Sequence, residues 1–196
     1  MGKIVYIMGK SSTGKDTIFK ALLSDSDYEF NTIVSYTTRP IREGERNGVE
    51  YNFVKEADFA ALSNAGKVVE DRAYDTCHGL WRYFTVADDS IDLKNKSYIT
   101  IGTLESYKKV RDYYGKDNVI PVLIELDDGI RLTRALNREK KQDVPKYEEM
   151  CRRFLADSKD FDEELIKKAK IKKRFKNEDL NLCIGEIKKY LRIEMA

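Results

Sequence analysis

The chain has 196 residues and a mass of 22.8 kDa, which suits one domain, since domains usually hold about 100–200 residues. Hydrophobic residues make up 41% and charged residues 36%, so a core can be buried and whole-chain disorder is not expected. Lys and Arg number 36 against 34 Asp and Glu, and the resulting charge of +2 excludes a strong overall field toward nucleic acid or membrane.

The cysteines and the histidine exclude further classes of site. Cys77, Cys151 and Cys183 are odd in number, far apart and without CxxC spacing, unlike a disulfide framework or a thiolate zinc site. His78 is the only histidine, which excludes a histidine-rich metal site. The longest apolar runs, such as 119–126, are too short to cross a bilayer, and the start of the chain lacks a signal-peptide pattern. We therefore expect a cytoplasmic protein with small-molecule partners rather than nucleic acid or membrane. The sequence leaves the oligomeric state open.

Apolar runs bounded by turn residues predict strands, and apolar residues at helical spacing predict helices. The expected strands are 3–8, 32–36, 50–54, 68–74, 97–101, 119–126 and 171–175. The expected helices are 18–23, 56–64, 104–114, 129–141, 147–157 and 178–191. Strands that alternate with helices predict an α/β fold, with a mostly parallel sheet and helices on both faces. The strand-rich segment from about 35 to 85 predicts a small mixed-sheet insertion.

The first predicted strand leads into a sequence that fits the phosphate-binding pattern GxxxxGK, and this pattern opens the first helix. Its glycines let backbone amides approach phosphate oxygens, while the helix N-terminus and Lys15 supply positive charge. The pattern predicts that ATP is held by Gly9, Ser11, Ser12, Thr13, Gly14 and Lys15.

The residue after this lysine is normally Ser or Thr, whose hydroxyl meets Mg²⁺. Here it is Asp16, followed by Thr17. An acid in the first turn stabilises a helix N-terminus, and a carboxylate can equally face the metal. Both interpretations stand, and the second makes Asp16 and Thr17 candidate ligands of Mg²⁺.

A second constellation begins at Ser35 and continues through Thr37-Thr38-Arg39, Arg42, Glu45, Gly48, Tyr51 and Phe53. It matches every position of the pattern T-[ST]-R-x2-[KR]-x2-[DE]-x2-G-x2-Y-x-[FY]. The chain therefore resembles the guanylate kinase family of nucleoside monophosphate kinases, over most of residues 3–191 and with a divergent middle.

The resemblance implies roles for the residues of this constellation. Ser35, Arg39, Arg42 and Tyr51 would bind the phosphate of the acceptor, and Glu70 would contact the guanine edge. The two arginines also make chemical sense without the resemblance, because planar guanidinium groups three residues apart can grip a monoester phosphate through paired hydrogen bonds.

Further positive charge is expected around the transferred phosphoryl group. Arg134 and Arg138 are spaced i, i+4 and share one helix face. The family carries such a pair, together with a third arginine that Arg153 or its neighbour Arg152 would match; these groups would neutralise charge during transfer. Asn177 resembles the family's asparagine near the adenine site.

The resemblance also implies an architecture and a reaction. A P-loop NTPase-type core would comprise residues 1–34 and 86–196, with an acceptor-binding insertion at 35–85 and a helical lid at about 134–153. The reaction would be ATP-dependent and would use Mg²⁺, phosphorylating a nucleoside monophosphate and most plausibly converting GMP or dGMP to GDP or dGDP.

The chain departs from the family at two positions. Thr100 and Gly102 stand where the family carries two aspartates, one at the water of the metal and one at guanine. The loss of an acceptor carboxylate weakens guanine selectivity, because specificity rests on matched buried hydrogen bonds. Asp16 is a candidate replacement for the carboxylate on the metal side.

Two other functions stay open. Ribose 1,5-bisphosphate phosphokinases share the GKD[ST] loop, a stretch similar to that at 78–83 and the glycine at 102, but generally lack the full constellation from Arg42 to Tyr51. Non-catalytic guanylate-kinase-like modules bind phosphopeptides and typically lose the phosphate loop, which is retained here. His78 is a candidate catalytic base, but phosphoryl transfer depends more on positioning and charge stabilisation than on a base. We expect His78 to have a structural or substrate-wall role, and Trp81 to pack in the core or stack on a base.

Overall fold

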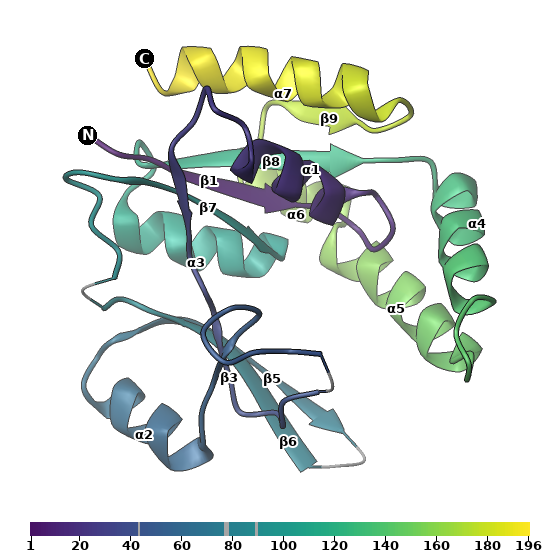
Figure 1. Ribbon diagram of the computed structural model, residues 1–196, viewed down its shortest axis with the longest axis horizontal. Helices are drawn as coiled ribbons and strands as arrows, with labels where there is room; N and C mark the ends of the chain where they lie inside the picture. Colours follow the sequence, from purple (N-terminus) through teal and green to yellow (C-terminus); the bar gives the residue numbers. More distant parts are fainter. Residues whose placement is uncertain (43, 77–78, 89) are drawn as a thin grey trace.

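The computed structural model describes residues 1–42, 44–76, 79–88 and 90–196, which form two sheets (Figure 1). The core sheet has the strand order β2-β7-β1-β8-β9, and all of its pairs are parallel. Its strands are β1 (Ile4–Met8), β2 (Phe30–Thr32), β7 (Ser97–Gly102), β8 (Val119–Glu125) and β9 (Arg174–Lys176). The predicted α/β fold with a mostly parallel central sheet is thus confirmed.

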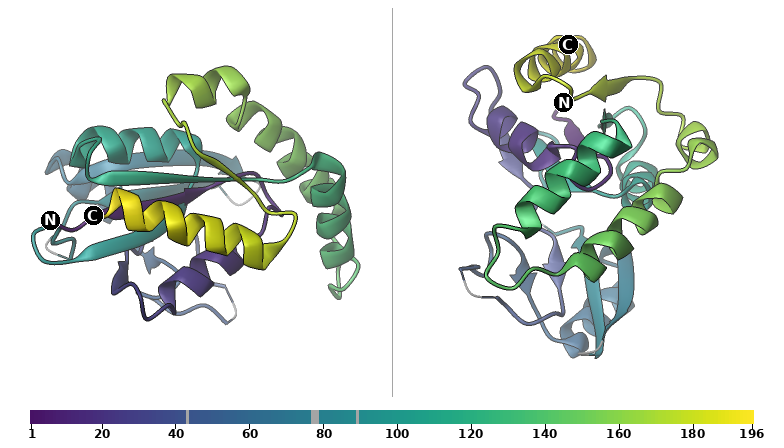
Figure 2. Two further views of the ribbon diagram at one scale, coloured as in Figure 1. Left: turned by 90° about the horizontal axis from the view of Figure 1, so that it is seen from above. Right: turned by 90° about the vertical axis from the view of Figure 1, so that its right-hand side faces the viewer.

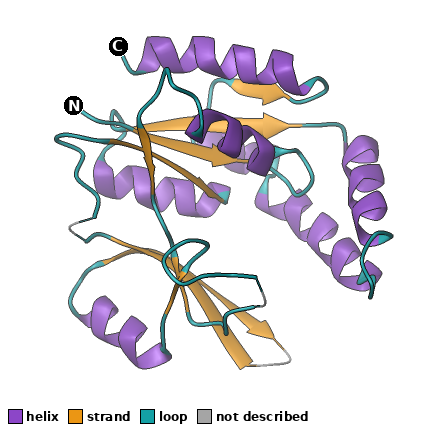
Figure 3. Ribbon diagram, in the orientation of Figure 1, coloured by secondary structure: helices purple, strands orange, loops and turns teal. Residues whose placement is uncertain are grey.

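Helices cover both faces of this sheet (Figure 3). Side chains alternate along a strand, so Ile4, Tyr6 and Met8 of β1 face one layer while Val5 and Ile7 face the other. The first layer includes α3 (Leu104–Tyr114) and α6 (Glu163–Lys168), and the second includes α1 (Lys15–Leu23) and α7 (Leu180–Glu194). Both faces of β1 are therefore apolar, as a strand buried on two sides requires.

The second sheet lies beside the core and has the order β4-β3-β6-β5. Its strands are β3 (Tyr36–Thr37), β4 (Asn52–Phe53), β5 (Val68–Thr76) and β6 (Gly79–Val86). The β3–β4 pair is parallel and the other pairs are antiparallel, which makes a mixed sheet. Helix α2 (Glu56–Asn64) packs on it through Phe59, whose ring lies 4.9 Å from that of the buried Phe84. Phe84 is thus a core residue.

Two further helices, α4 (Asp128–Glu139) and α5 (Tyr147–Asp160), follow β8 at the edge where the parallel strands end (Figure 2). This edge also carries the loop between β1 and α1 (Figure 1). Such an edge is where open α/β sheets bind their ligands. Within the described residues, no helix is both long and apolar enough to cross a lipid bilayer.

The structure corrects several of the expected elements, and it adds strand β6, which was not expected. The single strand expected at 32–36 is wrong, because β2 ends at Thr32 in one sheet and β3 begins at Tyr36 in the other. The strand expected at 171–175 is observed as the shorter β9, Arg174–Lys176. Ile171 lies outside the strand, and its apolar side chain packs in the core. Helix α6 was not expected; it has one buried residue, Ile166, and so shows little apolar periodicity.

Gly102 ends β7 at a point of close contact. A Cβ on this residue would lie 1.9 Å from the hydroxyl of Tyr6 and 2.7 Å from the Oγ atom of Ser106. Tyr6 is buried, and its hydroxyl is 2.6 Å from that of Ser106. Burial raises the pKa of Tyr6, so the phenol stays neutral. Tyr6 therefore fills the space that any side chain at position 102 would occupy.

This packing predicts that Gly102→Ala lowers the melting temperature by about 5 °C, because overpacking a core costs about 1–3 kcal/mol and each kcal/mol shifts the midpoint by about 2–4 °C in a protein of this size. Thermal unfolding followed by circular dichroism measures the change. Gly185→Ala is the matched control, since a Cβ at this position in α7 meets nothing within 4 Å. If Gly102→Ala lowers the melting temperature as much in a Tyr6→Leu background as in the wild type, a clash with Tyr6 is contradicted.

Candidate active site

The loop between β1 and α1 has the geometry of a phosphate-binding cradle. Gly14 caps α1 with a φ of +89°, a left-handed conformation that favours glycine. A Cβ on Gly14 would also meet the Nδ2 atom of Asn177 at 2.4 Å. Thr13 closes the loop on itself, with its hydroxyl donating to the carbonyl of Lys10 at 2.9 Å. Two independent constraints therefore require glycine at position 14.

Asn177 lies behind this loop and is buried. Its Nδ2 atom donates to the Thr13 carbonyl at 2.7 Å, and its backbone N–H donates to Glu125 of β8 at 2.9 Å. Asn177 thus ties the loop to the end of the core sheet. The expected place of Asn177 near adenine stays a prediction.

The amino group of Lys15 extends back over the loop, 3.4 Å from the Lys10 carbonyl. Burial lowers the pKa of Lys15, while the carboxylates of Asp16 and Asp157 oppose the shift. Ser12 holds a φ of 63°, and its buried hydroxyl has no hydrogen-bond partner among the described residues. A buried polar atom of this kind in a loop of backbone donors suits contact with an anionic ligand.

A buried ion pair that was not predicted from the sequence joins this loop to the helices beside it. Arg131 of α4 is 1% exposed; its Nη2 atom donates to the Oδ2 atom of Asp157 in α5 at 2.8 Å, and its Nε atom donates to the Ser11 carbonyl at 2.9 Å. The same Asp157 oxygen accepts the backbone N–H of Ser11 at 2.8 Å. Arg131 also contacts Asp128 and lies over the Phe154 ring at 4.9 Å.

The predicted arginines of α4 and α5 lie near the same loop. Arg138 and Arg153 line a small cavity of about 10 Å³ together with Ser11 and Ser12. The Nη1 atom of Arg134 is 3.9 Å from the position of a Cβ on Gly14. The structure therefore brings the phosphate loop and three of these arginines together.

The choice between Arg153 and Arg152 is also decided by geometry. Arg153 lines the small cavity and forms ion pairs at 3.7 Å with Glu139 and Glu149, while its buried Nε atom has no hydrogen-bond partner among the described residues. Arg152 instead forms a bidentate pair with Glu149 on the outer surface, with both N–O distances at 2.7 Å. Arg153, rather than Arg152, thus lies beside the phosphate loop.

The second predicted cluster lies on the mixed sheet and centres on Arg39. This side chain is buried, and its guanidinium forms a two-point pair with Glu45, with N–O distances of 2.7 and 2.5 Å. It lies between the rings of Tyr51 and Phe53, 5.2 Å from each centroid. The hydrogen bonds from Arg39 hold the pKa of Glu45 at about 2, so this carboxylate is ionised at neutral pH.

The guanidinium of Arg39 keeps donors for a ligand. Glu45 and the carbonyl of Pro40 take three of its N–H groups, and an arginine has five. Arg42 lies close by, since its backbone N–H donates to Glu45 at 2.8 Å, and its side chain is exposed. Ser35 is half-buried at the start of the same segment, where its carbonyl accepts the N–H of Asn52. This side of the sheet thus presents two guanidinium groups beside hydroxyls.

Glu70 is buried on β5, and both of its oxygens are engaged. Thr85 donates to one at 2.9 Å, and the Nε atom of Arg72 donates to the other at 3.2 Å. Arg72 was not singled out from the sequence, although its spacing of two from Glu70 places both on one face of the strand.

The candidate ligands of Mg²⁺ lie in the first turn of α1. Asp16 and Thr17 are exposed there, directly after Lys15. No group of three or more His, Cys, Asp or Glu side chains able to hold a metal exists among the described residues. Mg²⁺ usually takes one or two protein oxygens together with substrate phosphates and waters, so a carboxylate and a hydroxyl fit this ion.

Two of the residues considered from the sequence, His78 and Cys77, lie outside the described residues. Arg131 and Asp157 were missed, although the sequence carries a signal for each. Arg131 precedes Arg134 and Arg138 at i−3 and i−7, on the same helix face, and Asp157 follows Arg153 at i+4.

Comparisons with known proteins agree with this geometry. The profile of the family described as guanylate kinase matches residues 1–79. The guanylate kinase of Malacoplasma penetrans (strain HF-2) is 28% identical over 184 residues, which cover 90% of this chain and 82% of that protein. The guanylate kinase of Streptococcus pyogenes serotype M3 is 30% identical over 136 residues, covering 66% of this chain and 62% of that protein.

Other similarities are more local or are structural. The guanylate kinase of Aromatoleum aromaticum is 45% identical over 69 residues, and the aligned segment spans only 33% of that protein. Among solved structures, the guanylate kinase of Anaplasma phagocytophilum superposes with a TM-score of 0.63 at 22% identity, covering 98% of this chain and 86% of that one. This last similarity shows the fold.

The buried pair predicts that Arg131→Met destabilises the fold by about 3 kcal/mol, because it leaves Asp157 as an uncompensated, largely buried carboxylate. Urea denaturation at neutral pH measures the loss. The double variant Arg131→Met with Asp157→Leu should recover much of it, since both charges are then removed. Additive losses in the double variant would contradict the pairing.

Proposed function

We propose that this chain, which is similar to guanylate kinases, transfers the γ-phosphoryl group of ATP to a nucleoside monophosphate, with GMP or dGMP as the acceptor. The products are ADP and the nucleoside diphosphate. The single observation that carries this proposal is the presence of two separate phosphate-binding sets in one chain: the cradle at 9–15 on the core sheet and the Arg39 cluster on the mixed sheet.

The donor end uses the cradle. The backbone amides of the loop, the N-terminus of α1 and the amino group of Lys15 hold the β- and γ-phosphates of ATP. Asn177, Arg131 and Asp157 act as positioning residues, since they fix the loop backbone from behind and from the side. The orphan hydroxyl of Ser12 gains a partner when phosphate binds.

The acceptor end uses Arg39 and Arg42 as the grip on the monophosphate, with Ser35 and Tyr51 as hydroxyl donors. The Arg39–Glu45 pair fixes the guanidinium plane before the substrate arrives, which reduces the ordering cost of binding. A phosphate oxygen of the acceptor attacks the γ-phosphorus, and the bond from this phosphorus to the bridging oxygen of ADP breaks. The attacking phosphate is already ionised, so no catalytic base is required.

Helices α4 and α5 are proposed as the lid. Arg134, Arg138 and Arg153 neutralise charge that spreads over the equatorial oxygens of the transferred group. Their closeness to the cradle supports this role, since Arg138 and Arg153 share a cavity with Ser11 and Ser12. A closed lid excludes water, which prevents hydrolysis of ATP.

Asp16 and Thr17 are the residues proposed to hold Mg²⁺, directly or through its waters. When bound, the ion would offset the negative charge of the phosphates. The cytoplasm is the proposed compartment, because it holds both ATP and nucleoside monophosphates.

The test is an ADP-release assay with ATP and Mg²⁺ over GMP, dGMP, AMP, UMP, CMP and ribose 1,5-bisphosphate. We expect turnover with GMP or dGMP, and a loss of about hundredfold to thousandfold in Lys15→Met, which removes one charge at the developing transition state. Turnover with the sugar bisphosphate alone would replace this function by the sugar-phosphate kinase alternative. ATP binding without any turnover on the panel would favour a binding module.

Asp16→Ser should raise the Mg²⁺ concentration needed for half-maximal rate by about tenfold, because a carboxylate on the metal side is lost. A titration of Mg²⁺ at saturating ATP and GMP measures this shift. Glu164→Ser, which removes an exposed acid from the first turn of α6, is the control. An unchanged Mg²⁺ dependence in Asp16→Ser would leave Asp16 as a helix-stabilising acid only.

A further inference from the structure

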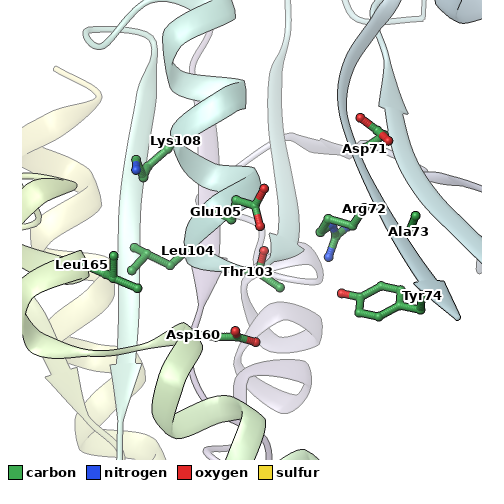
Figure 4. Close-up of a pocket in the computed structure, with 10 residues that line it drawn as sticks. All are labelled: Asp71, Arg72, Ala73, Tyr74, Thr103, Leu104, Glu105, Lys108, Asp160 and Leu165. Carbon is green, nitrogen blue, oxygen red and sulfur yellow. The ribbon is translucent and has the colours of Figure 1, made fainter.

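A cavity of about 570 Å³ lies between the edge strand β5 and the N-terminus of α3. This volume is in the range of small-molecule sites. Figure 4 shows Arg72 and Tyr74 directed from β5 toward Thr103 and Glu105 at the start of α3. The cavity thus lies between the two sheets, where a ligand held on the mixed sheet meets the core.

Arg72 is one of four β5 residues that line this cavity, and it is bonded to the buried Glu70. The side chain of Glu70 is 1% exposed and that of Arg72 is 19% exposed. Arg72 uses its Nε atom to reach the carboxylate. Among the described residues no acceptor is found for its Nη1 and Nη2 atoms, and the side chain lines the cavity.

Because of Glu70, the guanidinium of Arg72 is suited to bind a neutral ligand group. The carboxylate compensates the positive charge, and its bond to the Nε atom fixes the plane of the fork. Thr85 holds Glu70 in turn at 2.9 Å. A neutral ligand edge with two acceptors in one plane matches such a fork better than a free anion does.

Arg72 and the proposed phosphate grip belong to the same mixed sheet, with the strand order β4-β3-β6-β5. Arg39 lies 5.2 Å from the ring centroid of Tyr51. Burial raises the pKa of the Tyr51 hydroxyl, and the charges of both Arg39 and Arg72 oppose this shift. Tyr83 of β6 pairs with Arg72 of β5 on one side and with Thr37 of β3 on the other, and its ring lies 5.6 Å from that of Tyr51. A ligand with its phosphate on Arg39 can therefore extend across this sheet toward Arg72.

We propose that Arg72 reads the base of the acceptor, by donating from Nη1 and Nη2 to O6 and N7 of a 6-oxopurine, with Glu70 as its positioning residue. A two-point contact of this kind is the commonest specific contact between arginine and guanine. Adenine carries an amino group at C6, which would place a donor against a donor. The inference rests on the proposed function and narrows the acceptor to guanine or hypoxanthine nucleotides.

The experiment compares kcat/KM for GMP and for 2-aminopurine riboside 5′-monophosphate, which lacks O6, in the wild type and in Arg72→Met. The ratio of the two values does not depend on the fraction of folded enzyme, so partial misfolding cannot imitate the effect. We expect the preference for GMP to fall about tenfold to hundredfold, the range of a good two-point base contact. Arg72→Lys keeps the positive charge beside Glu70 but loses the planar guanidinium. Its preference for GMP should lie between those of the wild type and Arg72→Met.

Lys108→Met is the matched control, because it removes a positive charge from the same cavity without touching Glu70. Its ratio should equal that of the wild type. An unchanged ratio in Arg72→Met, or an equal fall in Lys108→Met, would overturn the role of Arg72 while leaving the proposed function intact. A wild-type enzyme that phosphorylates none of the nucleotides would overturn the proposed function itself, and the base contact with it.

Discussion

The arrangement of the candidate site depends on the buried pair of Arg131 and Asp157 around Ser11. Both partners bond the same residue of the phosphate loop, one at its carbonyl and one at its N–H. Because Arg131 belongs to α4 and Asp157 to α5, the pair fixes two helices and a loop at once. Burying two charges costs free energy, which only close geometry and further hydrogen bonds offset. The pair therefore serves positioning more than stability.

The same pattern recurs at the two other arginines that the site depends on. Arg39 is held by Glu45, and Arg72 is held by Glu70. Each carboxylate fixes a guanidinium plane and compensates its charge before any ligand binds, which limits attraction to arbitrary anions. This pairing is consistent with a chain of net charge +2 that nevertheless concentrates arginine at one site.

Much of the fold followed from periodicity, because strands and helices that pack against a common core carry their apolar residues at regular spacing. The helices expected at 56–64 and 104–114 have those bounds in the structure. Failures arose where tertiary context decides. The segment 32–36 is divided between two sheets, and Ile171 is apolar without being in a strand. Helix α6 buries one residue, too few for a period.

The sequence by itself determined the phosphate loop and the Arg39 cluster, because the residues of each are close in the chain and their spacing is fixed by a short stretch of backbone. Only the tertiary structure decided which groups complete them. Arg131 reaches Ser11 across 120 positions, and Tyr6 fills the space beside Gly102. Arg72 and Glu70 are only two residues apart, but the sequence does not show that Arg72 lines a cavity. The spacing of neighbouring residues can be seen directly in the sequence, whereas a contact between distant segments depends on how the sheets and helices pack.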